Sequence, residues 1–282
     1  MATDRPTDAG EAPSPADDPV GSPGSPPDEP RTRAELYAAG RAADRVPDVP
    51  RAADQAHTTA DGGWAWKSLR LDPPANHVAD QQLAARRSAE GRHPDGTYDD
   101  RGLTPALRRV ETQLGHGTLI PDTEKFALKS PDRFKEKLAK MMRTESDRPA
   151  ADLAREVHDG IRYTYVIDFE HYSAEVDEAR RLLRAEGYDE TAFKPSWSSD
   201  EYKGINSQWR DTASGYRFEV QFHTQDSWEA KQKTHDAYEK IESPQTSPAD
   251  RANLRDYQRH VSAQVAIPPA AFDFRPFKEQ EE

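Results

Sequence analysis

Residues 216–224 read Tyr-Arg-Phe-Glu-Val-Gln-Phe-His-Thr, and this alternation of apolar and polar side chains predicts a β-strand. Successive side chains of a β-strand point to opposite faces, so the pattern predicts one apolar face and one polar face. The residues expected in the core are Tyr216, Phe218, Val220 and Phe222. The other surface would carry Arg217, Glu219, Gln221 and His223. A carboxylate between a cation and an amide could serve metal-assisted phosphoryl transfer.

Patterns on both sides of this strand predict helices around a small sheet. A second strand is expected at residues 204–210, joined to the first by a hairpin turn that ends in Gly215. A third is expected at residues 161–167, which are rich in β-branched and aromatic side chains. Helices are expected at residues 76–92, 104–114, 131–142, 149–157, 172–186, 227–241 and 248–265. This order predicts an α+β or mixed α/β fold, a small mixed sheet with one antiparallel hairpin flanked by helices.

Residues 1–60 are expected to form a disordered, acidic tail rich in Pro and Ala. Eight prolines fall in residues 1–30, among small and polar residues that cannot bury enough apolar surface to offset the entropy of ordering. Residues 31–60 would carry at most one short helix, around residues 34–45. The rest divides into a helical extension at 61–117, a main domain at 118–266 and a C-terminal tail at 267–282. We expect the first sixty residues to be dispensable for chemistry.

The composition excludes several classes of function. The 282-residue chain has a formal net charge of −12, which argues against electrostatic attraction of the whole protein to nucleic acid. It has no cysteine, hence no disulfide, thiolate metal site or cysteine nucleophile. The N-terminus lacks a secretory signal, and no apolar run approaches the roughly 20 residues that span a bilayer. We expect a soluble, cytoplasmic protein without a membrane partner, and export by a route that needs no such signal stays open.

Two groups of charged residues suit phosphate and metal binding. Lys129, Arg133 and Lys137 are spaced by four at the start of a predicted helix, where the helix N-terminus also favours anions. The alternative is an exposed cationic helix face, which is common. Asp159 stands at the entrance of a predicted strand and could hold Mg²⁺ while Arg162 contacts a phosphate, although turns also favour aspartate there.

Two further groups suit recognition of a nucleotide. Residues 202–206 read Tyr-Lys-Gly-Ile-Asn, so a base could stack on Tyr202 while Gly204 lets another group approach closely. A loop tyrosine that covers the sheet edge is the alternative. The helix after Glu219 places Trp228, Lys231, His235 and Tyr238 on one face, with Glu239 alongside. An ordinary amphipathic helix is the alternative there, because one histidine forms no zinc site.

In chain order, these four groups resemble the synthetase domain of the RelA/SpoT family, whose members transfer pyrophosphate from ATP to a nucleotide 3′-hydroxyl. The resemblance covers residues 119–241. Asp159 precedes Gly-Ile-Arg at a strand entrance, as the metal-binding aspartate of the family does. Residues 202–206 are similar to the family's Tyr-x-Ser-x-His, and residues 219–224 to its Glu-Val-Gln-Ile-Arg-Thr.

A closer resemblance is to an actinobacterial branch with Arg-Tyr-Thr after the aspartate, a Tyr-Lys-Gly-Ile-Asn segment and a Gln-Phe-His-Thr end. This branch includes secreted nucleotide 3′-pyrophosphokinases and related toxin domains. Three positions depart from the family pattern. Asp159 adjoins the glycine instead of lying three residues ahead of it, with Glu156 as the other carboxylate nearby. Ala127 and His223 stand where the family has arginine, and a neutral imidazole binds phosphate less firmly than a guanidinium does.

The resemblance implies a nucleotidyltransferase-like fold and a Mg²⁺-dependent transfer of pyrophosphate from ATP to the 3′-hydroxyl of a purine nucleotide, giving products of the (p)ppApp or (p)ppGpp type. It implies that Asp159 and Glu219 are catalytic and hold the metal. The ATP phosphates would be bound by Lys129, Arg133, Lys137 and Arg162. The acceptor would be bound by Tyr202, Lys203, Asn206, Gln221, His223 and His235.

The resemblance fits a stress enzyme, a toxin or an effector, the last two with an antitoxin or immunity protein as partner. Two alternatives stay open. One is a catalytically silent relative that binds nucleotide, and the other is a toxin that adds pyrophosphate to the 3′ end of tRNA. For the enzyme, we expect Glu219 to be required for turnover but not for folding, since it lies on the polar face of its strand.

Overall fold

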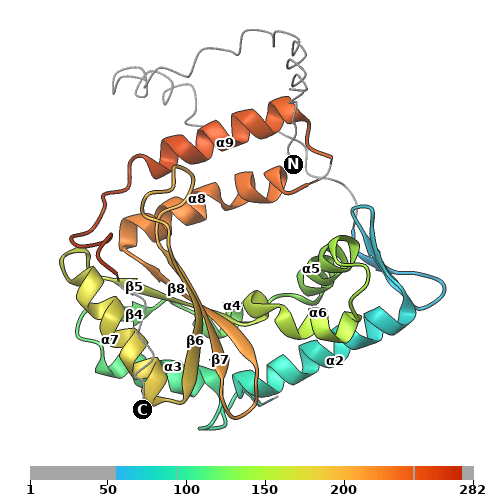
Figure 1. Cartoon of the computed structure of the whole chain (residues 1–282), viewed down its shortest axis with the longest axis horizontal. Coiled ribbons are helices and arrows are strands. Elements are labelled where there is room, and N and C mark those ends of the chain that lie inside the picture. Colours follow the sequence, from blue (N-terminus) through green and yellow to red (C-terminus); the bar gives the residue numbers. More distant parts are fainter. Residues whose placement is uncertain (1–54, 94, 244, 275–282) are drawn as a thin grey trace, which may run out of the picture.

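The computed structural model describes residues 55–93, 95–243 and 245–274 of the chain. Helices surround a five-stranded mixed sheet and a three-stranded antiparallel sheet (Figure 1). The predicted α+β class, with a small mixed sheet and one antiparallel hairpin flanked by helices, is confirmed. The tail through residue 54, its short helix at 34–45 and residues 275–282 lie outside the described residues. Within the described ranges, no helix has the length and apolar character needed to cross a membrane.

The predicted helices form close to their expected positions. Asp72 and Ser247 cap two of them by accepting backbone N–H groups. Ser130 takes the expected N-cap position of the helix that begins at Pro131, but its side chain makes no capping hydrogen bond. In chain order the helices are α2 (Pro73–Glu90), α3 (Leu103–Gln113), α4 (Thr123–Phe126), α5 (Pro131–Thr144), α6 (Ala150–Glu156), η1 (His158–Gly160), η2 (Phe169–His171), α7 (Tyr172–Ala185), α8 (Gln225–Ile241) and α9 (Pro248–Ser262).

The five-stranded sheet has the order β4-β5-β8-β7-β6. Its strands are β4 (Gly117–Leu119), β5 (Arg162–Ile167), β6 (Tyr188–Pro195), β7 (Ile205–Asp211) and β8 (Arg217–His223). β5 and β8 are parallel, and the other neighbours are antiparallel. The sequence did not predict β4 or β6. Both are edge strands with one partner each, so their residues need less of the alternating apolar pattern that marks a buried strand.

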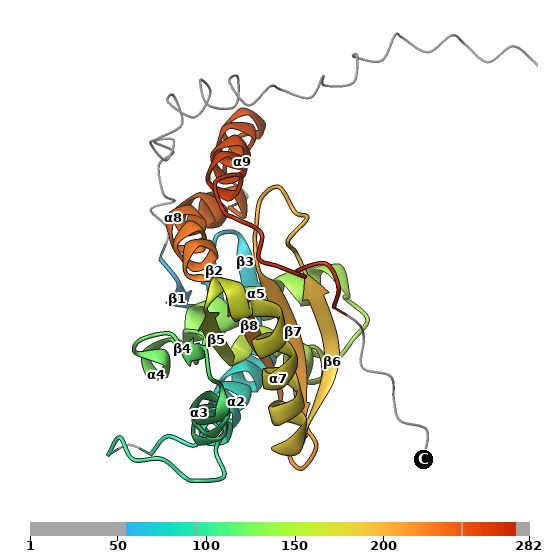
Figure 2. The same ribbon diagram turned by 90° about the vertical axis from the view of Figure 1, so that its left-hand side faces the viewer.

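Two clusters of buried apolar side chains hold the described residues together. The first packs between the five-stranded sheet, α3, α7, α8 and α9, and includes Leu107, Val176, Trp209, Phe218 and Leu254. The second packs between the small sheet, α2, α5 and α6, and includes Trp64, Leu71, Phe134, Leu138 and Leu153. Both views show α8 and α9 side by side above the five-stranded sheet (Figures 1 and 2). The division of the chain at residues 117 and 266 stays a prediction.

Strand β8 is buried on both faces. Phe218, Val220 and Phe222 are wholly buried, as predicted. The prediction was wrong for Tyr216, which precedes the strand and is only partly buried. Glu219, Gln221 and His223 are also buried, with exposed fractions of 6%, 4% and 0%. Their face is therefore an interior polar layer instead of an outer surface, because β5 and β7 flank the strand and α8 contacts its polar side.

Strand β1 (His57–Thr58) lies within the predicted tail. It pairs with β2 (Trp64–Trp66), which pairs with β3 (Leu69–Leu71). Thr59 N also donates to Gly63 O at 3.0 Å. Residues 57 and 58 are therefore a structural part of the small sheet, although they fall within the predicted tail.

Deleting residues 1–60 should destabilise the protein relative to deleting residues 1–54, because only the longer deletion removes β1, one of the two antiparallel partners of β2. A loss of 1 kcal/mol lowers the melting temperature by about 2–4 °C in a chain of this size. Thermal unfolding of the two truncated proteins measures the difference. Identical melting temperatures would mean that β1 contributes nothing to stability.

Candidate active site

Two backbone hydrogen bonds join the residues after Asp159 to the segment before α5. Lys129 N donates to Gly160 O at 3.0 Å, and Arg162 N donates to Ala127 O at 2.8 Å. This antiparallel pairing puts Lys129 Nζ 3.1 Å from Asp159 Oδ2. Ala127 is itself buried in the first apolar cluster.

The three cations around α5 have two different positions. Lys137 Nζ lies 3.5 Å from Asp159 Oδ1, so Lys129 and Lys137 flank the same carboxylate. Arg133 instead pairs with Glu136 at 2.9 Å and with Glu239 of α8. Spacing by four therefore brings the two lysines to Asp159 and leaves Arg133 bridging α5 and α8.

The register of the sheet joins the second carboxylate to the first. Glu219 lies opposite Arg162 on β5 and opposite Gln208 on β7. Arg162 Nε is 2.8 Å from Glu219 Oε1, while Arg162 Nη2 is 3.4 Å from Asp159 Oδ2. One guanidinium thus connects Asp159 and Glu219. We call Asp159, Arg162, Glu219, Lys129 and Lys137 the acid–base cluster.

The two oxygens of Glu219 are not equivalent. Oε1 contacts Arg162 and accepts a hydrogen bond from Gln221 Nε2 at 2.5 Å. Oε2 lies 3.8 Å from His158 Nε2, which is too long for a hydrogen bond. His158 is in turn 3.2 Å from Gln208 Nε2. The Oε2 oxygen is therefore the one that can take a proton or a cation.

Asp159 is ionised at neutral pH. Burial raises the pKa of its carboxyl group, but Lys129, Lys137 and Arg162 outweigh burial and lower the pKa to about 2. Burial also lowers the pKa of Lys129, and the charge of Asp159 opposes that shift. Asp159 Oδ1 is buried and receives no hydrogen bond from the described residues. A buried carboxylate oxygen without a donor suits a hard cation such as Mg²⁺, which commonly binds one or two carboxylates together with substrate phosphates.

Lys231 extends the polar layer from α8. Its ammonium group donates to Gln221 Oε1 and lies 4.6 Å from the centre of the Trp228 ring. Burial lowers the pKa of Lys231 to about 7, the charge of Arg162 adds to the shift and Glu219 opposes it. Sequence reasoning placed Lys231 on the correct helix face but did not select it as a site residue. Its position one turn after Trp228 was the available signal.

The hydroxyl of Tyr202 is held in place by a chain of hydrogen bonds. Its hydroxyl donates to Asn206 Oδ1 at 2.9 Å and lies 2.9 Å from His223 Nε2. His223 Nδ1 is 2.9 Å from Ser227 Oγ. Burial holds the pKa of His223 well below its usual range, and the charges of Lys231 and Arg162 add to the shift. His223 is therefore neutral and supports Tyr202.

The close approach predicted at Gly204 involves this histidine. Gly204 has φ +141°, and a Cβ atom there would lie 2.8 Å from His223 Cε1. A side chain at position 204 would thus strain the backbone and displace the imidazole. The glycine is required by packing between a loop and β8.

Three further candidates from the sequence have partners outside the acid–base cluster. Lys203 Nζ donates to the backbone carbonyls of Trp197 and Ser199 at 3.0 and 2.6 Å, and so closes its own loop. His235 is exposed and lies 3.3 Å from Glu239. Glu156 pairs with Arg148, so Asp159 and not Glu156 is the carboxylate that joins Lys129 and Lys137.

Arg86 of α2 holds the turn that carries Asp159, and sequence reasoning did not select it. Arg86 is buried, and its Nη2 donates to the backbone oxygens of Ala154 and Val157 at 2.8 and 3.0 Å. A Cβ atom at Gly160 would lie 2.5 Å from Arg86 Nε, so the glycine lets the guanidinium reach the turn. Burial lowers the pKa of Arg86 to about 10, and it remains charged at neutral pH.

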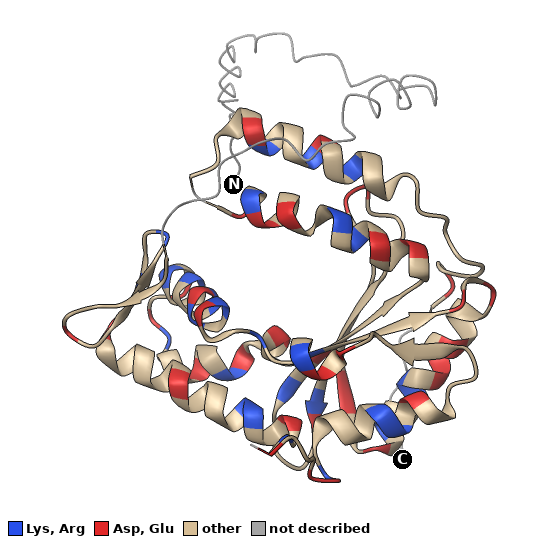
Figure 3. Cartoon of the chain, turned by 180° about the vertical axis from the view of Figure 1, so that it is seen from behind, with Lys and Arg blue, Asp and Glu red and all other residues tan. Residues whose placement is uncertain are grey.

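Acidic and basic residues are interspersed along α8 and α9 (Figure 3). Neither helix therefore presents the uniform basic stripe that favours contact with a nucleic acid backbone. The cations of the acid–base cluster are instead gathered around two carboxylates. This arrangement suits a compact polyphosphate better than an extended polyanion.

No protein-family model and no curated protein matches this chain. Among solved structures, small alarmone synthetase 1 from Bacillus subtilis is 14% identical with a TM-score of 0.43, over 65% of this chain and 90% of that chain. A GTP pyrophosphokinase family protein from Streptococcus pneumoniae is 14% identical with a TM-score of 0.42, over 69% and 90%. Small alarmone synthetase 2 from Bacillus subtilis is 13% identical with a TM-score of 0.41, over 64% and 90%. The sequence motifs resemble this same class of protein.

The lowered pKa of Lys231 predicts a pH-dependent stability. The unfolded chain, with a lysine pKa of about 10.4, binds more protons than the folded chain between about pH 7 and pH 10. Wild type therefore gains up to about 1.4 kcal/mol of unfolding free energy per pH unit from this group across that window. Lys231→Met should lack this gain, so wild type should improve relative to Lys231→Met from pH 7 to pH 9.5.

Urea unfolding of both proteins at the two pH values measures this difference. Lys233→Met is the control, because Lys233 is an exposed lysine of the same helix. If Lys231→Met follows the same pH trend as Lys233→Met, the pKa of Lys231 is not lowered.

Proposed function

We propose that this chain transfers pyrophosphate from ATP to the 3′-hydroxyl of a purine nucleotide. The observation that carries the proposal is the acid–base cluster, in which Arg162 joins Asp159 to Glu219 while Lys129 and Lys137 flank Asp159. Phosphoryl transfer needs little covalent chemistry from the protein, and depends on positioning and on charge stabilisation. A cluster of two carboxylates and three cations supplies both.

Lys129, Lys137 and Arg162 would bind the phosphates of ATP. Each is within 3.5 Å of a carboxylate oxygen of Asp159, so their charges already converge on one point. Asp159 and Glu219 would hold Mg²⁺, which would neutralise phosphate charge and help to hold the donor in line. The unbonded Oδ1 of Asp159 supports this assignment. Arg133, on the rim toward α8, would contact the outer part of the donor.

Glu219 would take the proton of the acceptor hydroxyl. The 3′-oxygen forms a bond to the β-phosphorus of ATP, the bond from that phosphorus to the α–β bridging oxygen breaks, and AMP leaves. The hydroxyl proton passes to Glu219 Oε2, the oxygen that Arg162 and Gln221 leave available. Arg162 and Gln221 fix the carboxylate in one orientation, which favours proton transfer along a defined direction.

Tyr202 would stack on the acceptor base. Its hydroxyl is tied to Asn206 and His223, which hold the ring in place before any base binds. Lys231, with its pKa near 7, would gain charge when an acceptor phosphate approaches. Adenine and guanine nucleotides both fit a stacking contact, which is tolerant of the base.

The direct test is incubation of the purified chain with γ-labelled ATP and Mg²⁺, with AMP, ADP, GDP, GTP or tRNA supplied separately. We expect release of AMP and transfer of label to a purine nucleotide. Label on tRNA alone, or binding of ATP without any transfer, would contradict the proposal and favour the tRNA enzyme or the silent relative. A toxin or effector role, with an antitoxin or immunity partner, stays a prediction from the sequence.

Glu219→Gln should lower AMP release by about 10²–10⁴-fold, the usual contribution of a positioned general base. It should also cost about 1–3 kcal/mol of stability, because the buried ion pair with Arg162 loses one charge. This revises the expectation that Glu219 is dispensable for folding. AMP release and urea unfolding measure the two effects.

Glu190→Gln is the matched control. Glu190 binds the buried Arg180 through two contacts of 2.8 Å, on β6 and α7 and away from the acid–base cluster. It should lose a similar amount of stability while keeping AMP release. Full activity of Glu219→Gln, or equal loss of activity in both variants, would remove Glu219 from its catalytic role.

Lys129→Ala and Lys137→Ala should each weaken binding of a non-hydrolysable ATP analogue by about 1–3 kcal/mol, the scale of a charge-assisted contact. Tyr202→Ala should impair use of the acceptor while analogue binding stays close to normal, because stacking on the acceptor base involves no ATP phosphate. Tyr202→Phe, which keeps the ring, should retain more acceptor use than Tyr202→Ala. Loss of analogue binding in Tyr202→Ala with normal binding in both lysine variants would reverse the donor and acceptor assignments.

A further inference from the structure

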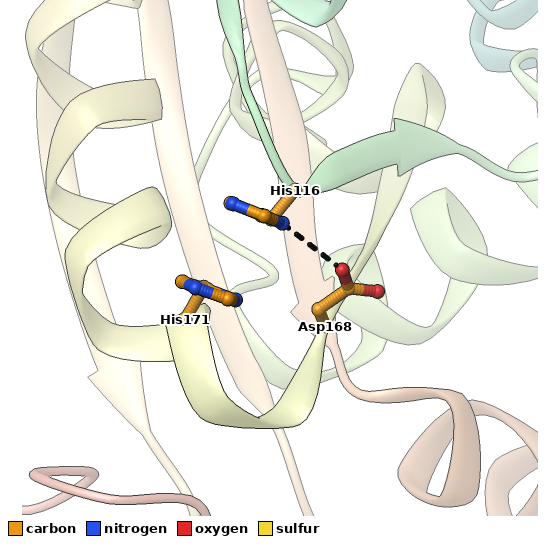
Figure 4. Close-up of side chains that lie close together, drawn as sticks. All are labelled: His116, Asp168 and His171. Carbon is orange, nitrogen blue, oxygen red and sulfur yellow. Dashed lines mark hydrogen bonds and ion pairs between the residues drawn. The ribbon is translucent and has the colours of Figure 1, made fainter.

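A second group of polar side chains lies at the opposite end of β5 from Arg162. It consists of His116 before β4, Asp168 after β5 and His171 at the end of η2 (Figure 4). The six residues of β5 separate it from the acid–base cluster by about 20 Å, at about 3.3 Å per residue. Nothing in the proposed reaction uses these three residues.

The backbone fixes the three positions. Gly117 pairs with Ile167 across β4 and β5, which sets His116 opposite Asp168. Asp168 N donates to His116 O at 2.9 Å, and His171 N donates to Asp168 O at 3.1 Å. The group is therefore built on a sheet edge and a hydrogen-bonded turn.

The three side chains lie close together. His116 Nδ1 is 3.2 Å from Asp168 Oδ2, and the rings of His116 and His171 lie parallel with centres 3.5 Å apart (Figure 4). One ligand atom of each residue lies within 4.8 Å of the others. Two ligands of a tetrahedral zinc ion, at about 2.0–2.1 Å from the metal, lie about 3.3 Å apart. The His116–Asp168 distance already has this value, and the exposed His171 ring can close the rest by side-chain rotation.

We propose that His116, Asp168 and His171 bind a divalent transition metal ion of the zinc class. Two imidazoles and one carboxylate suit Zn²⁺ and its neighbours, whereas Mg²⁺ prefers oxygen ligands alone. Three protein ligands leave one position of a tetrahedral ion for water or an anionic group. His116 and Asp168 also line an open depression of about 910 Å³, together with Thr118, Thr224 and Gln225. The metal would tie the start of β4 to the turn before α7.

The test uses the full chain without an affinity tag, freed of metal by a chelator and titrated with Zn²⁺ against a coloured competing chelator. We expect one equivalent of Zn²⁺ to bind. His116→Ala and His171→Ala should each weaken binding by at least about tenfold, as loss of a ligand does at least as much as loss of an outer partner. His77→Ala is the control, because His77 is an exposed histidine of α2 that pairs with Gln81.

Two further readouts make the outcome independent of catalysis. Co²⁺ in the same site should show the visible absorption of a tetrahedral ion in wild type and lose it in His116→Ala. Glu219→Gln should bind Zn²⁺ as wild type does. Zn²⁺ binding therefore tests this site separately from the proposed reaction. Unchanged affinity in His116→Ala or His171→Ala, or an equal loss in His77→Ala, would overturn the proposal.

Discussion

The ion pairs of Arg162 with Asp159 and Glu219 are the constraint on which the rest of the site depends. Two carboxylates near each other in a buried place would repel, and each would lose hydration without compensation. Arg162 compensates both, and Lys129 and Lys137 compensate Asp159 again from the other side. The arrangement needs β5 beside β8, because that pairing sets Arg162 opposite Glu219.

The same constraint explains why the polar side chains Glu219, Gln221 and His223 of β8 can be buried. The polar groups of β8 are linked by hydrogen bonds. Glu219 accepts from Gln221 on the same strand, and Gln221 accepts from Lys231 of α8. His223 does the same between Ser227 and Tyr202. Burial of these groups is tolerable because they are paired, and the pairing leaves few oxygens available. Glu219 Oε2 and Asp159 Oδ1 are such oxygens, which is where substrate chemistry is expected.

The sequence predicted the elements whose signals are local. The alternation in β8, the helix that begins at Pro131 and the turn before β8 could be found because each depends on neighbouring residues. Asp159 and Glu219 could be named as candidates, but the strand pairing that joins them through Arg162 is a contact between distant segments. Sequence reasoning did not select Arg86 and Lys231 for the same reason. Only packing against distant segments makes an ordinary helix residue a support for the site. Lys203 was selected from its place in a motif and His235 from its place on a helix face. Their actual partners, two loop carbonyls and Glu239, depend on contacts that no spacing encodes.

In the proposed reaction, Asp159 would be the carboxylate that holds the Mg²⁺ of the bound ATP. Calorimetric titration of a non-hydrolysable ATP analogue, with and without Mg²⁺, into wild type and Asp159→Asn tests it most directly. We expect Mg²⁺ to strengthen binding to wild type and Asp159→Asn to lose this dependence. Equal, Mg²⁺-dependent binding to both proteins would show that the nucleotide and its metal bind elsewhere.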